Sequence, residues 1–261
     1  MASDAGQSGG PLVEAGQAGE ASGAGGRGES GGTAASGGTS ATEGGAPSVS
    51  GDGGMGGDDK PTEPVFTVSE LIDDMEDGDA TLLGSNGDWF VIKDATGGII
   101  TPAKGEPFLM SSLSPARDAS TKAVAVTVSG FTGWGAAVGF DFSYVAAIKQ
   151  PTDLKQALAV RFWAKANKVT SVRFQMPNQD TDALGGKCSG TADNACNAHF
   201  TKAFAVGTEW KETTVLLSDL QQDLPGRRVP SFDKQHVYSS FFVIGPNESV
   251  TVWIDDLALV H

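Results

Sequence analysis

Two groups of carboxylates lie near the two ends of the region from residue 64 to residue 261, which is the part of the sequence that we expect to fold. The segment IDDMEDGD carries five acidic residues, and WIDDLAL supplies Asp255 and Asp256. Calcium in proteins takes about six to eight oxygen ligands, which include carboxylates and backbone carbonyls. A cage drawn from both segments would join the two ends of the domain, so the pattern predicts a structural calcium ion. The alternative is that these acids are turn residues and solvated surface charge.

The same carboxylates do not form a recognisable catalytic pair. Glycoside hydrolysis needs an acid and a base or nucleophile across a cleft, but the glutamates of the folded part lie mostly near turns and none is in an E-x-D-x-x-E arrangement. The chain has three histidines and no G-x-S-x-G elbow, and it lacks the glycine patterns that bind phosphates or dinucleotides. We therefore predict that the protein is not an enzyme.

Two tryptophans are candidates for the aromatic platforms on which sugar rings stack. Trp89 follows an N-G-D turn, and Trp134 lies between two glycines in FTGWGA, where a ligand can approach the backbone closely. Core packing is the alternative for both side chains. Trp163 and Trp253 lie within strand-like segments, and the sequence leaves open which face they occupy.

Polar residues that could bind sugar hydroxyl groups gather at one strand and the loop after it. In SVRFQMP, alternation places the apolar side chains on one face and Arg173 and Gln175 on the other. The segment that follows carries further polar side chains, which could converge on one rim. An ordinary solvated strand with an Asx-rich turn is the alternative. The predicted rim consists of Arg173, Gln175, Asp180, Asp182 and His199.

Cys188 and Cys196 have seven residues between them, in a segment rich in Gly, Ser, Asn and Asp. Short spacing in an irregular segment is typical of a disulfide that closes a loop in an oxidising compartment. A zinc site that adds His199 lacks a fourth ligand at the usual spacing, and two free thiols are the third alternative. We predict a disulfide.

The elements that would position these residues are β-strands. Seven short segments rich in Val, Phe, Trp and Thr are separated by turn residues, and no long stretch sustains a helical period. The segments are KAVAVTVSG, AAVGFDFS, ALAVRFWAKA, TSVRFQMP, KETTVLLS, SSFFVIG and SVTVWIDDLALV. They predict an all-β fold of two antiparallel sheets packed as a sandwich.

The first part of the chain differs in composition from the rest. Residues 1–63 hold 20 of the 36 glycines and almost no apolar side chains, so we predict a disordered Gly/Ser/Ala-rich linker there and one domain over residues 64–261. The net charge of −14 divides equally between the two parts, which argues against a nucleic-acid partner. No run of apolar residues is long enough to span a bilayer.

Several phrases occur together in one protein family. They are LIDDMEDGDATLLGSNGDWFVIKDATGG, FTGWGAAVGFDF, LAVRFWAKA, TSVRFQMPNQDTDALGGKC, TEWKETTVLLSDL and SVTVWIDDLALV. Their order and spacing over residues 70–260 resemble the galactose-binding-like β-sandwich modules of myxobacterial type, close to the family 11 carbohydrate-binding modules.

The resemblance implies a jelly-roll sandwich that presents a concave sheet face to polysaccharide and often holds a structural calcium ion. The family's calcium ligands come from an acidic first strand and an acidic last strand, which corresponds here to Glu76 and Asp256, with Asp74 and Asp255 as further ligands. Tethers such as residues 1–63 are similar to those that follow the lipidated cysteine or signal peptide of exported bacterial proteins.

The sequence thus predicts a non-catalytic carbohydrate-binding module on a flexible tether, which binds a β-glucan or another cell-wall polysaccharide. The alternative is a structural or adhesive surface module that makes protein contacts and has no glycan ligand. We expect a monomer that is secreted or held at the cell surface as an outer-membrane lipoprotein. In the second case the lipid anchor would lie on a missing N-terminal segment.

Overall fold

The computed structural model describes residues 68–190 and 192–261 of the chain. The described residues belong to one compact unit. The linker predicted over residues 1–63 lies outside the described residues.

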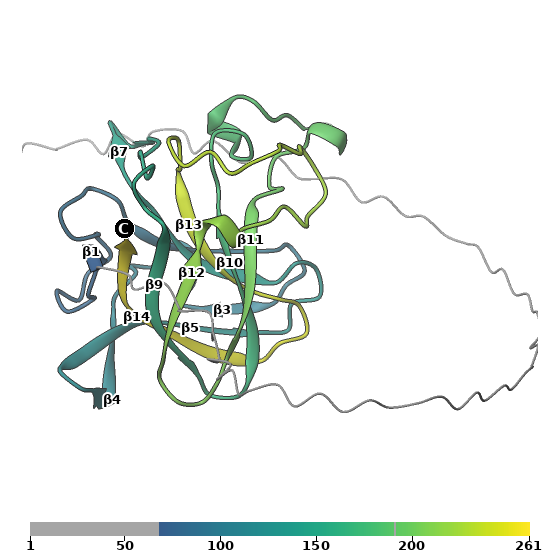
Figure 1. Ribbon diagram of the computed structural model, residues 1–261. Coiled ribbons are helices and arrows are strands. Elements are labelled where there is room, and N and C mark those ends of the chain that lie inside the picture. The colour runs from purple at the N-terminus through teal and green to yellow at the C-terminus, as the bar shows by residue number, and fades with distance from the viewer. Residues whose placement is uncertain (1–67, 191) are drawn as a thin grey trace, which may run out of the picture. The chain divides into compact units, whose positions relative to one another are not determined.

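The larger sheet has seven strands. Their bounds are β1 (Val68–Asp73), β3 (Ile99–Thr101), β4 (Ser111–Arg117), β5 (Ser120–Ser129), β9 (Ala159–Ala166), β12 (Lys211–Leu216) and β14 (Val250–Val260). Five of them lie in the order β12-β9-β14-β5-β3, while β1 pairs with β14 and β4 pairs with β5. The first and last strands of the domain are therefore neighbours (Figure 1).

The second sheet has five strands in the order β11-β10-β13-β6-β2. Their bounds are β2 (Trp89–Lys93), β6 (Ala136–Asp141), β10 (Thr170–Met176), β11 (Phe200–Val206) and β13 (Ser239–Ile244). A short hairpin, β7 (Tyr144–Val145) with β8 (Ile148–Lys149), follows β6. Every pairing between these strands is antiparallel.

Helical structure in the described residues is limited to short 3-10 turns. They are η1 (Ala183–Gly185), η2 (Ala192–Asn194) and η3 (Leu217–Asp219). In the described part of the chain, no helix has the length and apolar character needed to cross a membrane.

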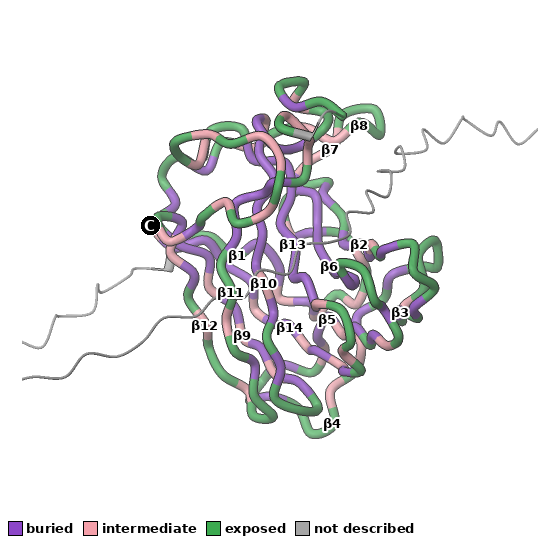
Figure 2. The backbone as a smooth tube through the Cα atoms, turned by 90° about the vertical axis from the view of Figure 1, so that its right-hand side faces the viewer, coloured by how far each residue is buried: buried purple, intermediate pink, exposed green. Residues whose placement is uncertain are grey.

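The core lies between the two sheets, where aromatic rings from both meet. Phe162 of β9 is fully buried, and its ring centroid lies 6.0 Å from that of Phe174 and 4.9 Å from that of Phe242. Burial of such rings is the main favourable term in folding. Figure 2 shows buried residues gathered along the central strands and exposed residues mostly in the loops and turns. The predicted antiparallel β-sandwich is confirmed.

The alternation predicted for β10 is also confirmed. Val172, Phe174 and Met176 are fully buried in the core. Because neighbouring residues of a strand point to opposite faces, Arg173 and Gln175 lie on the outward face of the five-stranded sheet. This face is the candidate binding surface.

Candidate functional site

The outward face of the five-stranded sheet carries two polar side chains from β10. Arg173 lies opposite Val243 of β13, and Gln175 lies opposite Phe241. Gln175 is buried, whereas Arg173 is partly exposed. Within residues 68–190 and 192–261, the Arg173 guanidinium makes no hydrogen bond or ion pair, so its donors are available to a ligand.

An apolar strip lies beside these polar side chains. It consists of Phe90 and Ile92 of β2, Ala137 of β6, and Phe241 and Val243 of β13. Gly139 allows this packing, because a Cβ atom there would lie 2.3 Å from the Phe241 ring. Phe90 meets that ring edge-on, with 5.8 Å between the centroids, and stays partly exposed. The apolar strip thus offers ring surface next to hydrogen-bonding groups.

A group of five polar residues, which we call the lysine cluster, lies at one end of the face. Its members are Asp141, Tyr144, Lys149, Asp182 and Ser239. Lys149 Nζ donates to Asp182 Oδ2 at 2.7 Å and to Ser239 Oγ at 3.1 Å, and it lies 3.5 Å from Asp141 Oδ1. The Tyr144 hydroxyl donates to Asp141 at 2.5 Å. Burial and this hydrogen bond raise the pKa of Tyr144 above its ordinary value.

His199 lies one residue before β11 and is 7% exposed. Its ring centroid is 6.0 Å from that of Phe241, and its Nδ1 atom is 3.0 Å from Thr181 Oγ1. Burial lowers the pKa of His199 to about 4, although the charge of Asp182 acts in the opposite direction. At neutral pH the imidazole is therefore an uncharged hydrogen-bonding group.

The loop between β10 and β11 contains the predicted disulfide, which joins Cys188 to Cys196 and closes a short ring within this loop. Asp182 lies at the start of this loop as the N-cap of η1, and its Oδ1 atom accepts the Leu184 N–H at 2.9 Å. The other oxygen of Asp182 accepts from Lys149, which belongs to the β7–β8 hairpin. Asp182 therefore joins the disulfide-closed loop to the hairpin.

The structure brings together three of the five predicted rim residues. Gln175 and His199 both adjoin Phe241, and Asp182 is close enough to His199 to affect its charge. Arg173 lies on the same face, two residues from Gln175.

Asp180 differs from the other predicted rim residues. It is buried, and its Oδ1 atom lies 3.5 Å from Arg227 and 3.6 Å from Lys187. These two cations already neutralise its carboxylate. Asp180 is thus part of the loop's own packing rather than of the lysine cluster.

Four members of the lysine cluster were not predicted from the sequence, namely Asp141, Tyr144, Lys149 and Ser239. Alternation in GFDF could have placed Asp141 on the same face as Gly139. No comparable signal existed for Lys149, because its position depends on how the β7–β8 hairpin packs against the loop after β10.

The prediction that Trp89 is a platform is wrong. Trp89 is 2% exposed and lies in the core, with ring centroids 4.8 Å from Phe140 and 6.4 Å from Phe108. Its Nε1–H donates to Asp73 Oδ2 at 2.7 Å. Burial raises the pKa of Asp73 to about 6 despite this hydrogen bond. The turn before Trp89 did not reveal which face of β2 it would occupy.

Trp134 is 42% exposed, in the loop that precedes β6. Its neighbours Gly133 and Gly135 are needed for packing, because Cβ atoms there would lie 2.7 Å from Asp94 Oδ2 and 2.0 Å from the Ile244 carbonyl. Trp134 lies at the opposite end of β6 from Asp141, roughly 20 Å away at the usual rise of a strand. The exposed ring is separate from the lysine cluster, and the role of Trp134 as a platform stays a prediction.

The other three tryptophans lie partly exposed on the outward side of the larger sheet. Lys165 Nζ lies 4.9 Å from the ring centroid of Trp210 and 5.1 Å from that of Trp253. The Arg117 guanidinium lies 4.7 Å from the centroid of Trp163. Cations of the chain itself therefore contact these rings, which makes them poorer platforms for a sugar.

The fold of this chain resembles that of solved carbohydrate-binding modules. No protein-family model and no curated protein matches the sequence. Among solved structures, the family 11 carbohydrate-binding module of the cellulosomal cellulase Lic26A-Cel5E of Clostridium thermocellum aligns with a TM-score of 0.50 and 17% identity, over 74% of this chain and 95% of that chain. This chain has the β-sandwich fold of a family 11 carbohydrate-binding module. The fold that the resemblance implied is confirmed.

A second solved structure is the family 30 carbohydrate-binding module of the cellulosomal cellulase Cel9D-Cel44B of Clostridium thermocellum. It aligns with a TM-score of 0.46 and 13% identity, over 75% of this chain and 94% of that chain.

The calcium ligands predicted from the resemblance do not form a cage in this carbohydrate-binding-module fold. Asp74 Oδ1 accepts the Glu76 N–H at 3.1 Å within a turn, and Arg117 pairs with both Asp255 and Asp256. Over residues 68–190 and 192–261, no three His, Cys, Asp or Glu side chains are grouped so as to hold a metal ion. As paired here, these carboxylates do not fit a calcium ion, so the predicted calcium site has no support in this arrangement.

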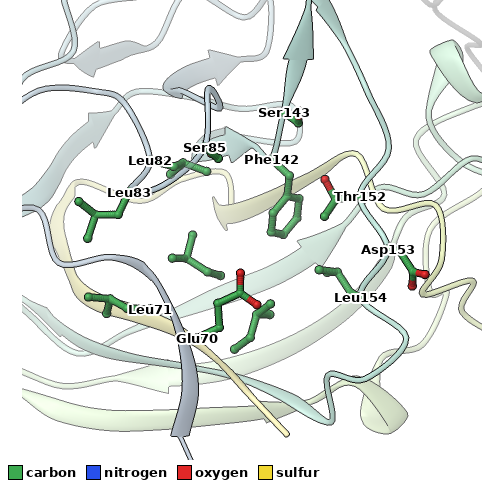
Figure 3. A pocket seen from close by; sticks show the side chains of 12 residues that line it. Glu70, Leu71, Leu82, Leu83, Ser85, Phe142, Ser143, Thr152, Asp153 and Leu154 are labelled. Atoms are coloured by element: carbon green, nitrogen blue, oxygen red, sulfur yellow. The ribbon is translucent and has the colours of Figure 1, made fainter.

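A pocket of about 290 Å³ lies beside β1 (Figure 3). Glu70 and Leu71 of β1 line it together with Leu82, Phe142 and Leu154. None of its lining residues belongs to the predicted rim or the lysine cluster. The pocket is therefore not part of the candidate binding face.

Proposed function

We propose that this domain binds a polysaccharide, of the β-glucan type or another cell-wall type, on the outward face of the five-stranded sheet. The observation that carries the proposal is the convergence there of Arg173 and Gln175 with the apolar strip and the lysine cluster. The structural likeness to a family 11 module supports the proposal at the level of the β-sandwich fold, of which this face is one side.

The face combines the two kinds of contact that a sugar needs. The C–H side of a pyranose ring packs on apolar side chains, for which Phe90 and Ile92 of the apolar strip are partly exposed. Hydroxyl groups need fixed donors and acceptors. Arg173 supplies free guanidinium donors, and the oxygens of the lysine cluster supply acceptors held in place by Lys149.

Binding on this face is proposed without catalysis. Asp141 and Asp182 are the carboxylates of the lysine cluster, and both contact the ammonium of Lys149. A glycosidase instead places two carboxyl groups on either side of the bond to be cleaved, one of them as the proton donor. Paired to a shared lysine, these two aspartates are suited to orienting hydroxyl groups.

The disulfide also bears on the compartment in which the domain works. The disulfide is compatible with an oxidising compartment outside the cytosol. We propose that the protein is secreted or displayed at the cell surface, as a monomer, with a lipid anchor as one means of attachment.

Retention on insoluble polysaccharides tests the proposal. The protein is incubated with a panel that includes β-glucans, and the bound fraction is measured with and without competing soluble oligosaccharide. We expect retention on one class of polysaccharide, relieved by the matching oligosaccharide. A protein that stays folded and ignores every glycan would instead favour the structural or adhesive module with protein partners.

Two arginine variants locate the binding face. Arg173→Ala removes the free guanidinium of the proposed face and should weaken retention about tenfold or more, since one or two charge-assisted hydrogen bonds are lost. The matched control is Arg161→Ala, because Arg161 lies on the larger sheet and is 3.6 Å from Glu212 in a partly exposed pair. Equal retention by both variants would place the site elsewhere.

A further inference from the structure

The last strand carries two adjacent carboxylates at an irregular point. The pairing of β14 with β9 shifts register between Asp255 and Ala258, and Asp256 has a φ of 46°. This bulge leaves the side chain of Asp255 fully buried, while that of Asp256 is 40% exposed. A buried carboxylate needs a compensating charge and hydrogen-bond donors.

Arg117, at the end of β4, supplies that charge. Its Nε atom lies 3.0 Å from Asp255 Oδ2, and one of its terminal nitrogens donates to Asp256 Oδ2. The Arg117 side chain is only 8% exposed, so both contacts are sheltered from water. One guanidinium thus bridges the two carboxylates with separate donors, as its planar fork allows.

Aromatic rings hold the guanidinium in this position. The Arg117 guanidinium carbon lies 4.7 Å from the ring centroid of Trp163 and 5.7 Å from that of Trp210. A cation over an indole face is attracted by the ring as well as by its carboxylate partners. Arg117 therefore contacts both β14 and the outward side of β9.

Other carboxylate oxygens at this end of the domain also have donors. Ser120 Oγ lies 2.7 Å from Asp255 Oδ2, and Asp255 Oδ1 accepts the Asp256 N–H at 2.9 Å. Glu76 Oε1 accepts the N–H groups of Thr121 and Lys122 at 2.8 and 2.9 Å. A metal ion at these oxygens would have to compete with the donors that already contact them.

We propose that Arg117 takes the place of a structural cation at the junction of the first and last strands, and that the domain folds there without calcium. Two of the acids that suggested an ion in the sequence lie close together, because the Ser120 hydroxyl contacts both Asp255 and Glu76. The positive charge among them comes from a side chain.

Thermal unfolding of the unaltered domain tests this directly. We expect the same melting temperature, within about one degree, in excess calcium and in EDTA. An ion bound only by the folded state, at a hundredfold excess over its dissociation constant, would raise the melting temperature by roughly 5–10 °C. A rise of that size would overturn the proposal.

Variants of Arg117 test the other half of the proposal, in EDTA. Arg117→Gln should lower the melting temperature by roughly 5–15 °C, because Asp255 loses its buried counter-charge. Arg117→Lys keeps the charge and should recover part of the loss. The matched control is Arg161→Gln, whose exposed pair with Glu212 contributes little. An unchanged melting temperature for Arg117→Gln would overturn the proposal. If neither Arg117 variant folds, the comparison of calcium with EDTA still decides it.

Discussion

At the scale of single residues, two tryptophans that lie beside similar turn signals differ in burial. Trp89 is buried and donates to Asp73, so Trp89→Ala removes core packing and leaves a buried carboxylate with one donor fewer. We expect it to lower the free energy of unfolding by about 3–5 kcal/mol. Chemical denaturation measures this change, and a loss below about 1 kcal/mol would contradict the assignment of Trp89 to the core.

Trp134 serves as the comparison, because its side chain is 42% exposed. Trp134→Ala should change the free energy of unfolding by less than about 1 kcal/mol. If the exposed ring stacks on sugar, the same variant should also weaken polysaccharide retention. A folded variant with unchanged retention would remove Trp134 from the binding surface.

His199 should make stability depend on pH. Its pKa falls from 6.5 to about 4 on folding because the ring is buried, with Asp182 and Lys149 as the nearby charges. The folded state therefore favours neutral imidazole. This contribution is fully present above pH 6.5 and is lost as the pH falls toward 4, by about 3 kcal/mol in total.

The variant His199→Gln isolates this effect, because glutamine does not titrate. As the pH falls from 6.5 to 4, the free energy of unfolding of the unaltered protein should decrease relative to that of the variant. Urea denaturation at a series of pH values measures it. A difference that is independent of pH would show that His199 is not held neutral by burial.

Residue types and alternation predicted part of the site. The pattern of SVRFQMP correctly placed Arg173 and Gln175 outside the core, because a strand has a period of two. The same reasoning could not orient Trp89, since both faces of its segment are apolar. The partners of Asp180 and Asp255 lie far along the chain, so local sequence gave no sign that Arg227 and Arg117 would neutralise them.

At the scale of elements, the disulfide-closed loop holds one side of the lysine cluster through Asp182. Replacing both cysteines, Cys188→Ser with Cys196→Ser, should cost about 2–3 kcal/mol, because the loop that the disulfide closes is short. The sandwich should stay folded, while polysaccharide retention weakens as Asp182 and Lys149 lose their fixed geometry. Retention equal to that of the parent protein would show that the loop does not shape the site.

The long strands could be predicted from sequence and the β7–β8 hairpin could not. Segments such as SSFFVIG are rich in β-branched and aromatic residues, and each became a strand. The hairpin has strands of two residues, and its turn uses Ala146 and Ala147 at φ values of 49° and 62°. Turns of this kind usually carry Gly or Asn, so the usual signal was absent. Lys149 was missed for the same reason.

At the scale of the whole molecule, the acidic balance of the chain bears on how it holds a ligand. The net charge of −14 does not favour an anionic polymer, and the proposed contacts are apolar packing and hydrogen bonds. We therefore expect retention on an uncharged polysaccharide to change by less than about twofold between low and high salt, because screening acts mainly on exposed charges. A steep loss of retention with salt would instead indicate recognition by charge.

The proposed function requires that the polysaccharide binds on the outward face of the five-stranded sheet. Backbone amide NMR spectra, recorded while a soluble oligosaccharide of the retained class is added, test it most directly. We expect the largest chemical-shift changes on β10 and β13 around Arg173 and Gln175, and in the lysine cluster. Shifts confined to the outward side of the larger sheet, around Trp253 and Thr251, would contradict it.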